Sequence, residues 1–106
     1  MKELRFNEKV LLKPQRSLYI PLNEGIYKLK IKVYQGRIRI NHGVYTPDGG
    51  TWLDSSSGRK AHYDFKAGDT SYITIDIKTS FNKTDRLNVV VPSLFHSSEF
   101  CIDICT

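Results

Sequence analysis

The sequence contains no long apolar run. No window approaches the roughly 20 consecutive apolar residues that a membrane-spanning helix needs, and the opening stretch Met1–Phe6 lacks the long apolar core of a secretory signal. These two absences argue against a membrane span and against export. We therefore expect a chain that stays where it is made.

Cysteine is scarce, since Cys101 and Cys105 are the only two. They lie in a run with the pattern of a strand, where four residues at about 3.3 Å each hold them roughly 13 Å apart. A disulfide requires Cα atoms within about 7 Å, so a regular strand excludes a bond between them. A domain without an internal disulfide fits a reducing compartment, and we expect a cytoplasmic or virion-associated location.

Signatures of catalysis and of metal binding are also missing. There is no Gly-x-Ser-x-Gly elbow, no phosphate-binding glycine-rich loop and no His-Glu-x-x-His motif. The metal-capable residues His42, His62 and His96 have no cysteines at zinc spacing, and Asp48-Gly49-Gly50 lacks the repeated acidic positions of a calcium loop. We expect no enzyme activity, no metal and no cofactor.

The sequence contains short alternating runs separated by turn residues, and no stretch keeps a helical period. This pattern predicts an all-β fold, an antiparallel two-sheet β-sandwich of the jelly-roll kind with about eight strands. A chain of 106 residues is expected to form a single domain over residues 1–106. The predicted strands are Lys9–Leu12, Ser17–Leu22, Ile26–Tyr34, Arg37–Asn41, Ala61–Lys66, Ser71–Lys78, Leu87–Val91 and Glu99–Cys105.

Two hairpins are predicted from these runs. The first joins Ile26–Tyr34 to Arg37–Asn41 through a two-residue turn at Gln35-Gly36, and its register puts all apolar residues on one face. The second joins Tyr63–Lys66 to Tyr72–Ile77, with its isoleucines pointing inward. The unbroken apolar run Val89–Val91 before Pro92 predicts a central strand.

The first predicted hairpin carries a basic stripe. Sixteen Lys and Arg against eleven Asp and Glu give a formal net charge of +5, and like charges facing each other destabilise a sheet. One interpretation is that a bound polyanion or acidic partner offsets this repulsion. The other is a solvated face relieved by neighbouring acids such as Asp76. The stripe consists of Lys28, Lys30, Lys32, Arg37 and Arg39.

Aromatic residues give two further candidates, each with two interpretations. Tyr19, Tyr34 and Tyr72 fall on the polar phase of their strands, where they either stack on sugars or bases or pack over lysine stems. Trp52 lies within the long connection from Asn41 to His62. It either stacks on a pyranose ring or closes the end of the sandwich.

The sequence resembles jelly-roll carbohydrate-binding modules, including those attached to phage tail proteins. The resemblance rests on Gly25–Val33, on Tyr63–Gly68 and on the closing Phe100–Asp103, and it spans about residues 15–105. It implies a non-catalytic glycan-binding module and transfers no ligand residues, because no binding motif is matched position by position. The chain departs from secreted members in its basic stripe and its lone cysteine pair.

Three hypotheses follow for the function. The first is a glycan-binding or adhesion module whose ligand-binding residues lie in and beside the long connection. The second is a viral or phage accessory protein that binds a protein or a polyanion through the basic hairpin. The third is a subunit whose strand edges and Cys101/Cys105 face pack into a homo-oligomer. The residues assigned to the glycan site are Tyr45, Asp48, Trp52, Asp54 and His42.

Overall fold

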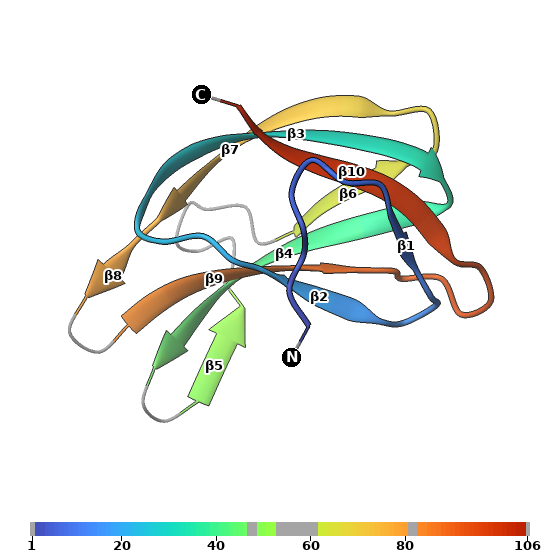
Figure 1. Cartoon of the computed structure of the whole chain (residues 1–106). Helices are drawn as coiled ribbons and strands as arrows, with labels where there is room; N and C mark the ends of the chain where they lie inside the picture. The colour runs from blue at the N-terminus through green and yellow to red at the C-terminus, as the bar shows by residue number, and fades with distance from the viewer. Residues whose placement is uncertain (1, 47–48, 53–61, 81–82, 106) are drawn as a thin grey trace.

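The computed structural model describes residues 2–46, 49–52, 62–80 and 83–105. Two antiparallel sheets pack against each other (Figure 1). The four-stranded sheet has the order β1 (Val10–Leu12), β10 (Ser98–Cys105), β3 (Gly25–Gln35), β7 (Thr70–Ile77). The six-stranded sheet begins with β2 (Ser17–Ile20), β9 (Lys83–Val90) and β4 (Arg37–Thr46), with β5 (Gly49–Trp52) and β6 (His62–Lys66) beside β4 and β8 (Thr79–Ser80) beside β9.

The order of the strands is that of a jelly roll. Apart from the short strands β5 and β8, the chain places β1, β3, β7 and β10 in one sheet and β2, β4, β6 and β9 in the other. Strands that are neighbours in the sequence therefore mostly lie in opposite sheets. This confirms the predicted all-β sandwich and its jelly-roll topology. None of the described residues belongs to a helix that could span a membrane.

Both predicted hairpins are wrong, because each of their turns crosses between the sheets. β3 pairs with β10 and β7, whereas β4 pairs with β9, β5 and β6. β6 and β7 are separated in the same way. The two crossing turns lie side by side, since the Ala67 N–H donates to Gly36 O at 2.8 Å and the Gly68 N–H donates to Val33 O at 3.0 Å. Each turn thus satisfies backbone groups of the other.

The core lies between the two sheets and is built from one phase of every long strand. Ile75 and Ile77 of β7 point inward as predicted. The predicted central strand is also confirmed, because β9 lies between β2 and β4 and both Val89 and Val91 are fully buried. Burial of each such side chain stabilises the fold by about 1.5–3 kcal/mol. The alternation that positions the core also fixes which side chains face outward.

The N-terminal segment before β1 ties the two sheets together along one side (Figure 1). The Leu4 N–H donates to Tyr19 O on β2 at 2.7 Å, and the Asn7 N–H donates to Ile102 O on β10 at 3.1 Å. The Leu4 side chain is buried in the core. This segment therefore runs from β2, at the edge of the six-stranded sheet, to β10 in the four-stranded sheet, and it covers part of the space between the two sheets.

The predicted long connection from Asn41 to His62 contains more strand than expected. β4 continues to Thr46 and forms a short hairpin with β5, in which Gly43 pairs with Trp52 and Thr46 pairs with Gly49. The glycines and polar residues of this stretch favoured a loop in the sequence. Pairing with β9 and β5 nevertheless supplies the backbone hydrogen bonds that keep it extended.

Candidate functional site

The outer face of the six-stranded sheet carries a row of polar side chains in register across four strands. Tyr19 of β2 is opposite Asn88 of β9, Asn88 is opposite Asn41 of β4, and Asn41 is opposite His62 of β6. These four residues are called the polar row below. They face outward because Ile40 and His42 on either side of Asn41 point into the core.

Hydrogen bonds within the polar row fix the orientation of its groups. The Asn41 Nδ2 donates to Asn88 Oδ1 at 3.0 Å, and Asn41 Oδ1 lies 2.6 Å from His62 Nδ1. An amide oxygen only accepts, so the proton of the neutral imidazole is on Nδ1 and its Nε2 is an acceptor. The exposed ring of His62 therefore presents a hydrogen-bond acceptor of defined direction.

A hollow of about 470 Å³ lies beside the polar row. Arg39 stands at its border and also borders a second hollow of about 530 Å³ toward Lys66 and Asp69. Its Nε donates to Asp64 Oδ1 at 2.7 Å, which holds the planar guanidinium in place and leaves further N–H groups on it. The first hollow is lined by Gln15, Arg39, Asn41, His62, Val90, Val91 and Pro92.

The opposite side of the polar row leads to the β4–β5 hairpin. Gly43 follows Asn41 on the outward phase of β4, and its cross-strand neighbours are Arg86 on β9 and Trp52 on β5. The Arg86 guanidinium lies 5.9 Å from the centre of the Tyr19 ring. Trp52 on β5 therefore pairs with the β4 residue that lies two positions after Asn41, the member of the polar row on β4.

The residues assigned to the glycan site from the sequence lie in different places. Tyr45 and Trp52 belong to the paired strands β4 and β5, whereas Asp48 and Asp54 lie outside the described residues. His42 is only 4% exposed. Its burial removes it from the surface that a ligand reaches, so its assignment to the glycan site is corrected here.

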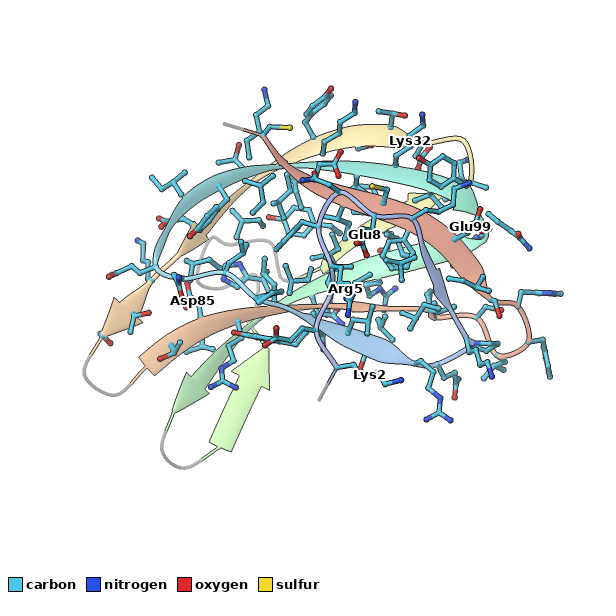
Figure 2. The ribbon with its side chains drawn as sticks, viewed as in Figure 1. Lys2, Arg5, Glu8, Lys32, Asp85 and Glu99 are labelled. Carbon is cyan, nitrogen blue, oxygen red and sulfur yellow. The ribbon has the colours of Figure 1, made fainter. Side chains whose placement is uncertain are left out.

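His42 forms part of a buried contact with Asp85 at the end of the sandwich away from the β3–β4 turn (Figure 2). The His42 Nε2 lies 3.3 Å from Asp85 Oδ2. The same carboxylate oxygen accepts from the Lys78 N–H at 3.1 Å. A buried carboxylate needs such partners. Through them Asp85 joins β9 to His42 on β4 and to Lys78, the residue that follows β7.

The predicted basic stripe is divided between the two sheets. Lys28, Lys30 and Lys32 lie on β3 in the outer face of the four-stranded sheet, whereas Arg37 and Arg39 belong to β4 in the other sheet. The interpretation as one hairpin face is therefore wrong. The cause is the sheet crossing at Gly36, which the alternating pattern of the two strands does not reveal.

Acidic and aromatic side chains surround the three lysines. Lys30 is in register with Asp103 on β10 and with Tyr72 on β7. Lys9 lies 3.4 Å from Glu99 and 4.4 Å from the centre of the Tyr34 ring, while Figure 2 shows Lys32 and Glu99 on this same side of the molecule. Charge on this face is therefore partly compensated within the protein.

The three outer tyrosines do not form one surface. Tyr34 and Tyr72 lie on the neighbouring strands β3 and β7, where Lys32 and Lys28 approach their rings at 5.4 Å and 5.1 Å. Tyr19 lies on β2 in the other sheet. Of the three tyrosines, only Tyr19 therefore belongs to the polar row.

The cysteines of β10 are free thiols, as expected from their spacing. The Cys101 thiol donates to Asp103 Oδ1 at 3.2 Å. Burial, this hydrogen bond and the nearby negative charge raise the pKa of Cys101 to about 11. The thiol is protonated at neutral pH and is a poor nucleophile.

Within residues 2–46, 49–52, 62–80 and 83–105, no cluster of three or more His, Cys, Asp or Glu residues is placed to hold a metal ion. Comparison of the chain with protein-family models, with curated proteins and with solved structures finds no match.

The polar row was missed by the sequence interpretation. His62 was noted there only as a metal-capable residue, and Asn88 was not singled out. Both lie on the polar phase of predicted strands, which is a signal that each faces outward. Bringing them together with Asn41 requires the strand order, because β9 and β6 flank β4 from distant parts of the sequence.

Proposed function

We propose that this chain is a non-catalytic binding module that recognises a glycan on the outer face of its six-stranded sheet. The observation that carries the proposal is the polar row, whose Asn88, Asn41 and His62 are linked by hydrogen bonds beside a hollow of about 470 Å³. Ligand sites generally combine such a hollow with a few polar groups of fixed direction.

The chemistry of this face suits a sugar. The His62 Nε2 accepts a hydrogen bond from a hydroxyl, and the Arg39 guanidinium donates to a ring or hydroxyl oxygen. Pro92 and Val90 supply apolar surface within the hollow for the C–H face of a pyranose. In this proposal the β4–β5 hairpin, with Tyr45 and Trp52, borders the ligand on the other side.

The alternative of a polyanion-binding module has less support from the arrangement of charge. The five cations once assigned to one face lie in two sheets. The face with three lysines also contains Glu99 and Asp103 on β10. Nucleic acid binding, which depends on many uncompensated phosphate contacts, is therefore kept as an outcome of the test.

The test is binding of the purified chain to an array of neutral glycans, acidic glycans and nucleic acids at low and at moderate salt. We expect salt-resistant signal on particular sugars. His62→Ala and Asn88→Ala should each weaken this signal by about tenfold, since each removes a hydrogen-bonding group from the row. Trp52→Ala tests the contribution of the β4–β5 hairpin.

Tyr72→Ala is the matched control, because Tyr72 is an exposed side chain on the outer face of the other sheet. Its signal should equal that of the unmodified chain. Circular dichroism must show that every variant keeps the strand content and the melting transition. Equal binding by His62→Ala and Tyr72→Ala, or signal that disappears at moderate salt on all polyanions, would contradict the glycan proposal.

A further inference from the structure

The turn between β9 and β10 presents two adjacent apolar side chains to solvent. Leu94 is 65% exposed and Phe95 is 83% exposed, and the two are called the apolar tip below. Single exposed apolar residues are common on protein surfaces. A leucine and a phenylalanine side by side at the end of a sandwich require a further reason, because burying them elsewhere would stabilise the fold.

Hydrogen bonds hold this turn in a defined conformation. The Ser93 Oγ accepts from the Phe95 N–H at 3.3 Å and from the His96 N–H at 3.1 Å. The Ser98 Oγ, at the start of β10, accepts from the Arg37 N–H at 2.9 Å and donates to Arg37 O. The turn is thus anchored at both ends, and the exposure of the apolar tip is part of the folded conformation.

Four exposed cations lie on the turns next to the β9–β10 turn and are called the basic collar: Lys13, Arg16, Arg37 and Lys66. Arg37 lines a hollow together with Ser93 and His96 of the turn, and Lys66 lines a hollow with Arg37 and Pro92. Arg16 O accepts from the Val91 N–H at 3.1 Å, and Lys13 lies in the same short turn as Arg16.

Negative charge at this end of the sandwich is low. Among the described residues of the four turns 13–16, 35–37, 66–69 and 91–98, Asp69 is the one acidic residue. Its carboxylate accepts from the Lys66 N–H at 2.9 Å. The acids Asp64 and Glu99 on adjoining strands form ion pairs with Arg39 and Lys9. Figure 1 shows these turns gathered at one end of the molecule. The apolar tip therefore projects from a surface of net positive charge.

We propose that the apolar tip and the basic collar dock on an anionic lipid bilayer. A bilayer accepts a projecting side chain without any matching pocket, whereas a protein partner needs a shaped surface. Apolar insertion and cationic attraction are each weak alone and together give stable membrane binding. The polar row lies on a sheet face, and its hollow reaches this end only at Gln15, Val91 and Pro92. The lipid proposal uses none of the hydrogen-bonding groups of the polar row, so the two are tested separately.

The test is co-sedimentation of the full chain with vesicles of phosphatidylcholine alone and with vesicles that also contain phosphatidylserine. No glycolipid is present, so failure here leaves the glycan proposal untouched. We expect binding only to the phosphatidylserine vesicles. The double variant Leu94→Asp, Phe95→Asp should weaken it by at least about tenfold, because it places charge where the tip enters the bilayer.

Two matched controls separate this mechanism from non-specific adsorption. Ile26 is 74% exposed at the start of β3, away from the β9–β10 turn, and Ile26→Asp should leave vesicle binding unchanged. The pair Arg37→Glu, Lys66→Glu should weaken binding by at least about tenfold. The pair Lys28→Glu, Lys30→Glu makes the same charge change on the four-stranded sheet and should weaken binding much less.

Phe95→Trp provides a gain-of-function arm, since tryptophan partitions well into the membrane interface and should increase the bound fraction. Melting curves must show that the aspartate variants fold. The proposal is overturned if the chain ignores phosphatidylserine vesicles. It is equally overturned if Ile26→Asp weakens binding as much as the tip variant does, or if only charge changes matter, which would indicate general polyanion binding.

Discussion

At the scale of single residues, Cys101 shows how a neighbouring carboxylate controls a thiol. Its Sγ–H donates to Asp103 Oδ1, and burial followed by this contact raises the pKa of Cys101 to about 11. Only the thiolate attacks alkylating reagents. In a Cys105→Ser background, alkylation of Cys101 by iodoacetamide should be slow at neutral pH and should rise steeply with pH until it approaches about 11.

Asp103→Asn tests the cause of this shift. The amide removes the negative charge that disfavours the thiolate, so the pKa of Cys101 falls and alkylation at mildly alkaline pH accelerates. A fall of one pKa unit corresponds to about tenfold more thiolate. Mass spectrometry of the alkylated protein measures the rate. An unchanged rate in Asp103→Asn would assign the raised pKa to burial alone.

His42 and His62 show what the sequence does and does not reveal about one residue. Alternation along Arg37–Asn41 correctly placed Ile38 and Ile40 in the core. Continued to His42, the same alternation would have placed that side chain inside, but the predicted strand ended one residue earlier. His62 lies on the outward phase of β6, and its partner Asn41 becomes visible only once β4 and β6 are known to pair.

At the scale of elements, the crossing at Gly36 explains both the fold and the errors in its prediction. A two-residue connection between alternating strands favours a hairpin. Here the chain turns into the other sheet at Gly36, which has φ +75° and lies against Ser98. The alternating pattern is the same in either case, because both strands bury one face whichever sheet they join. Pairing was therefore not predictable from periodicity.

Gly36 and Gly68 offer a matched pair of substitutions at the two crossing turns. Both have positive φ, but a Cβ at Gly36 would meet Ser98 Oγ and would lie 2.8 Å from Ser97 O, whereas a Cβ at Gly68 meets no atom within 4 Å. Gly68→Ala should cost about 1–2 kcal/mol for backbone strain alone. Gly36→Ala should cost about 1–3 kcal/mol more, because packed neighbours must also move.

Urea denaturation followed by circular dichroism measures both free energies of unfolding. The backbone contribution is common to the two variants, so their difference reports the contact with β10. Equal destabilisation by the two alanines would show that the Ser97–Ser98 segment moves freely and does not anchor the crossing. That outcome would also weaken the argument that the β9–β10 turn is held in one conformation.

At the scale of the whole molecule, the fold class could be predicted because it follows from local features alone. Short alternating runs, frequent turn residues and a missing helical period all indicate a two-sheet sandwich. The distribution of surface chemistry could not be predicted in the same way. It depends on which strands share a sheet, and jelly-roll topology places Lys28–Lys32 and Arg37–Arg39 on different outer faces despite their closeness in the sequence.

This separation gives the last prediction, because one charge can be removed from either face with the same change in net charge. Lys30→Gln and Arg39→Gln each lower the formal net charge from +5 to +4. General attraction to polyanions therefore changes equally in both. Arg39 borders the hollow beside the polar row, so Arg39→Gln should weaken glycan binding by about tenfold or more, the effect of losing a charged hydrogen bond.

Lys30→Gln should leave glycan affinity within about twofold, since Lys30 lies on β3 in the opposite sheet. Isothermal titration calorimetry with the glycan identified on the array measures both affinities. Equal losses in the two variants would mean that net charge, rather than the polar row, determines binding. A loss confined to Lys30→Gln would move the binding site to the four-stranded sheet, where Lys30 is flanked by Asp103 and Tyr72.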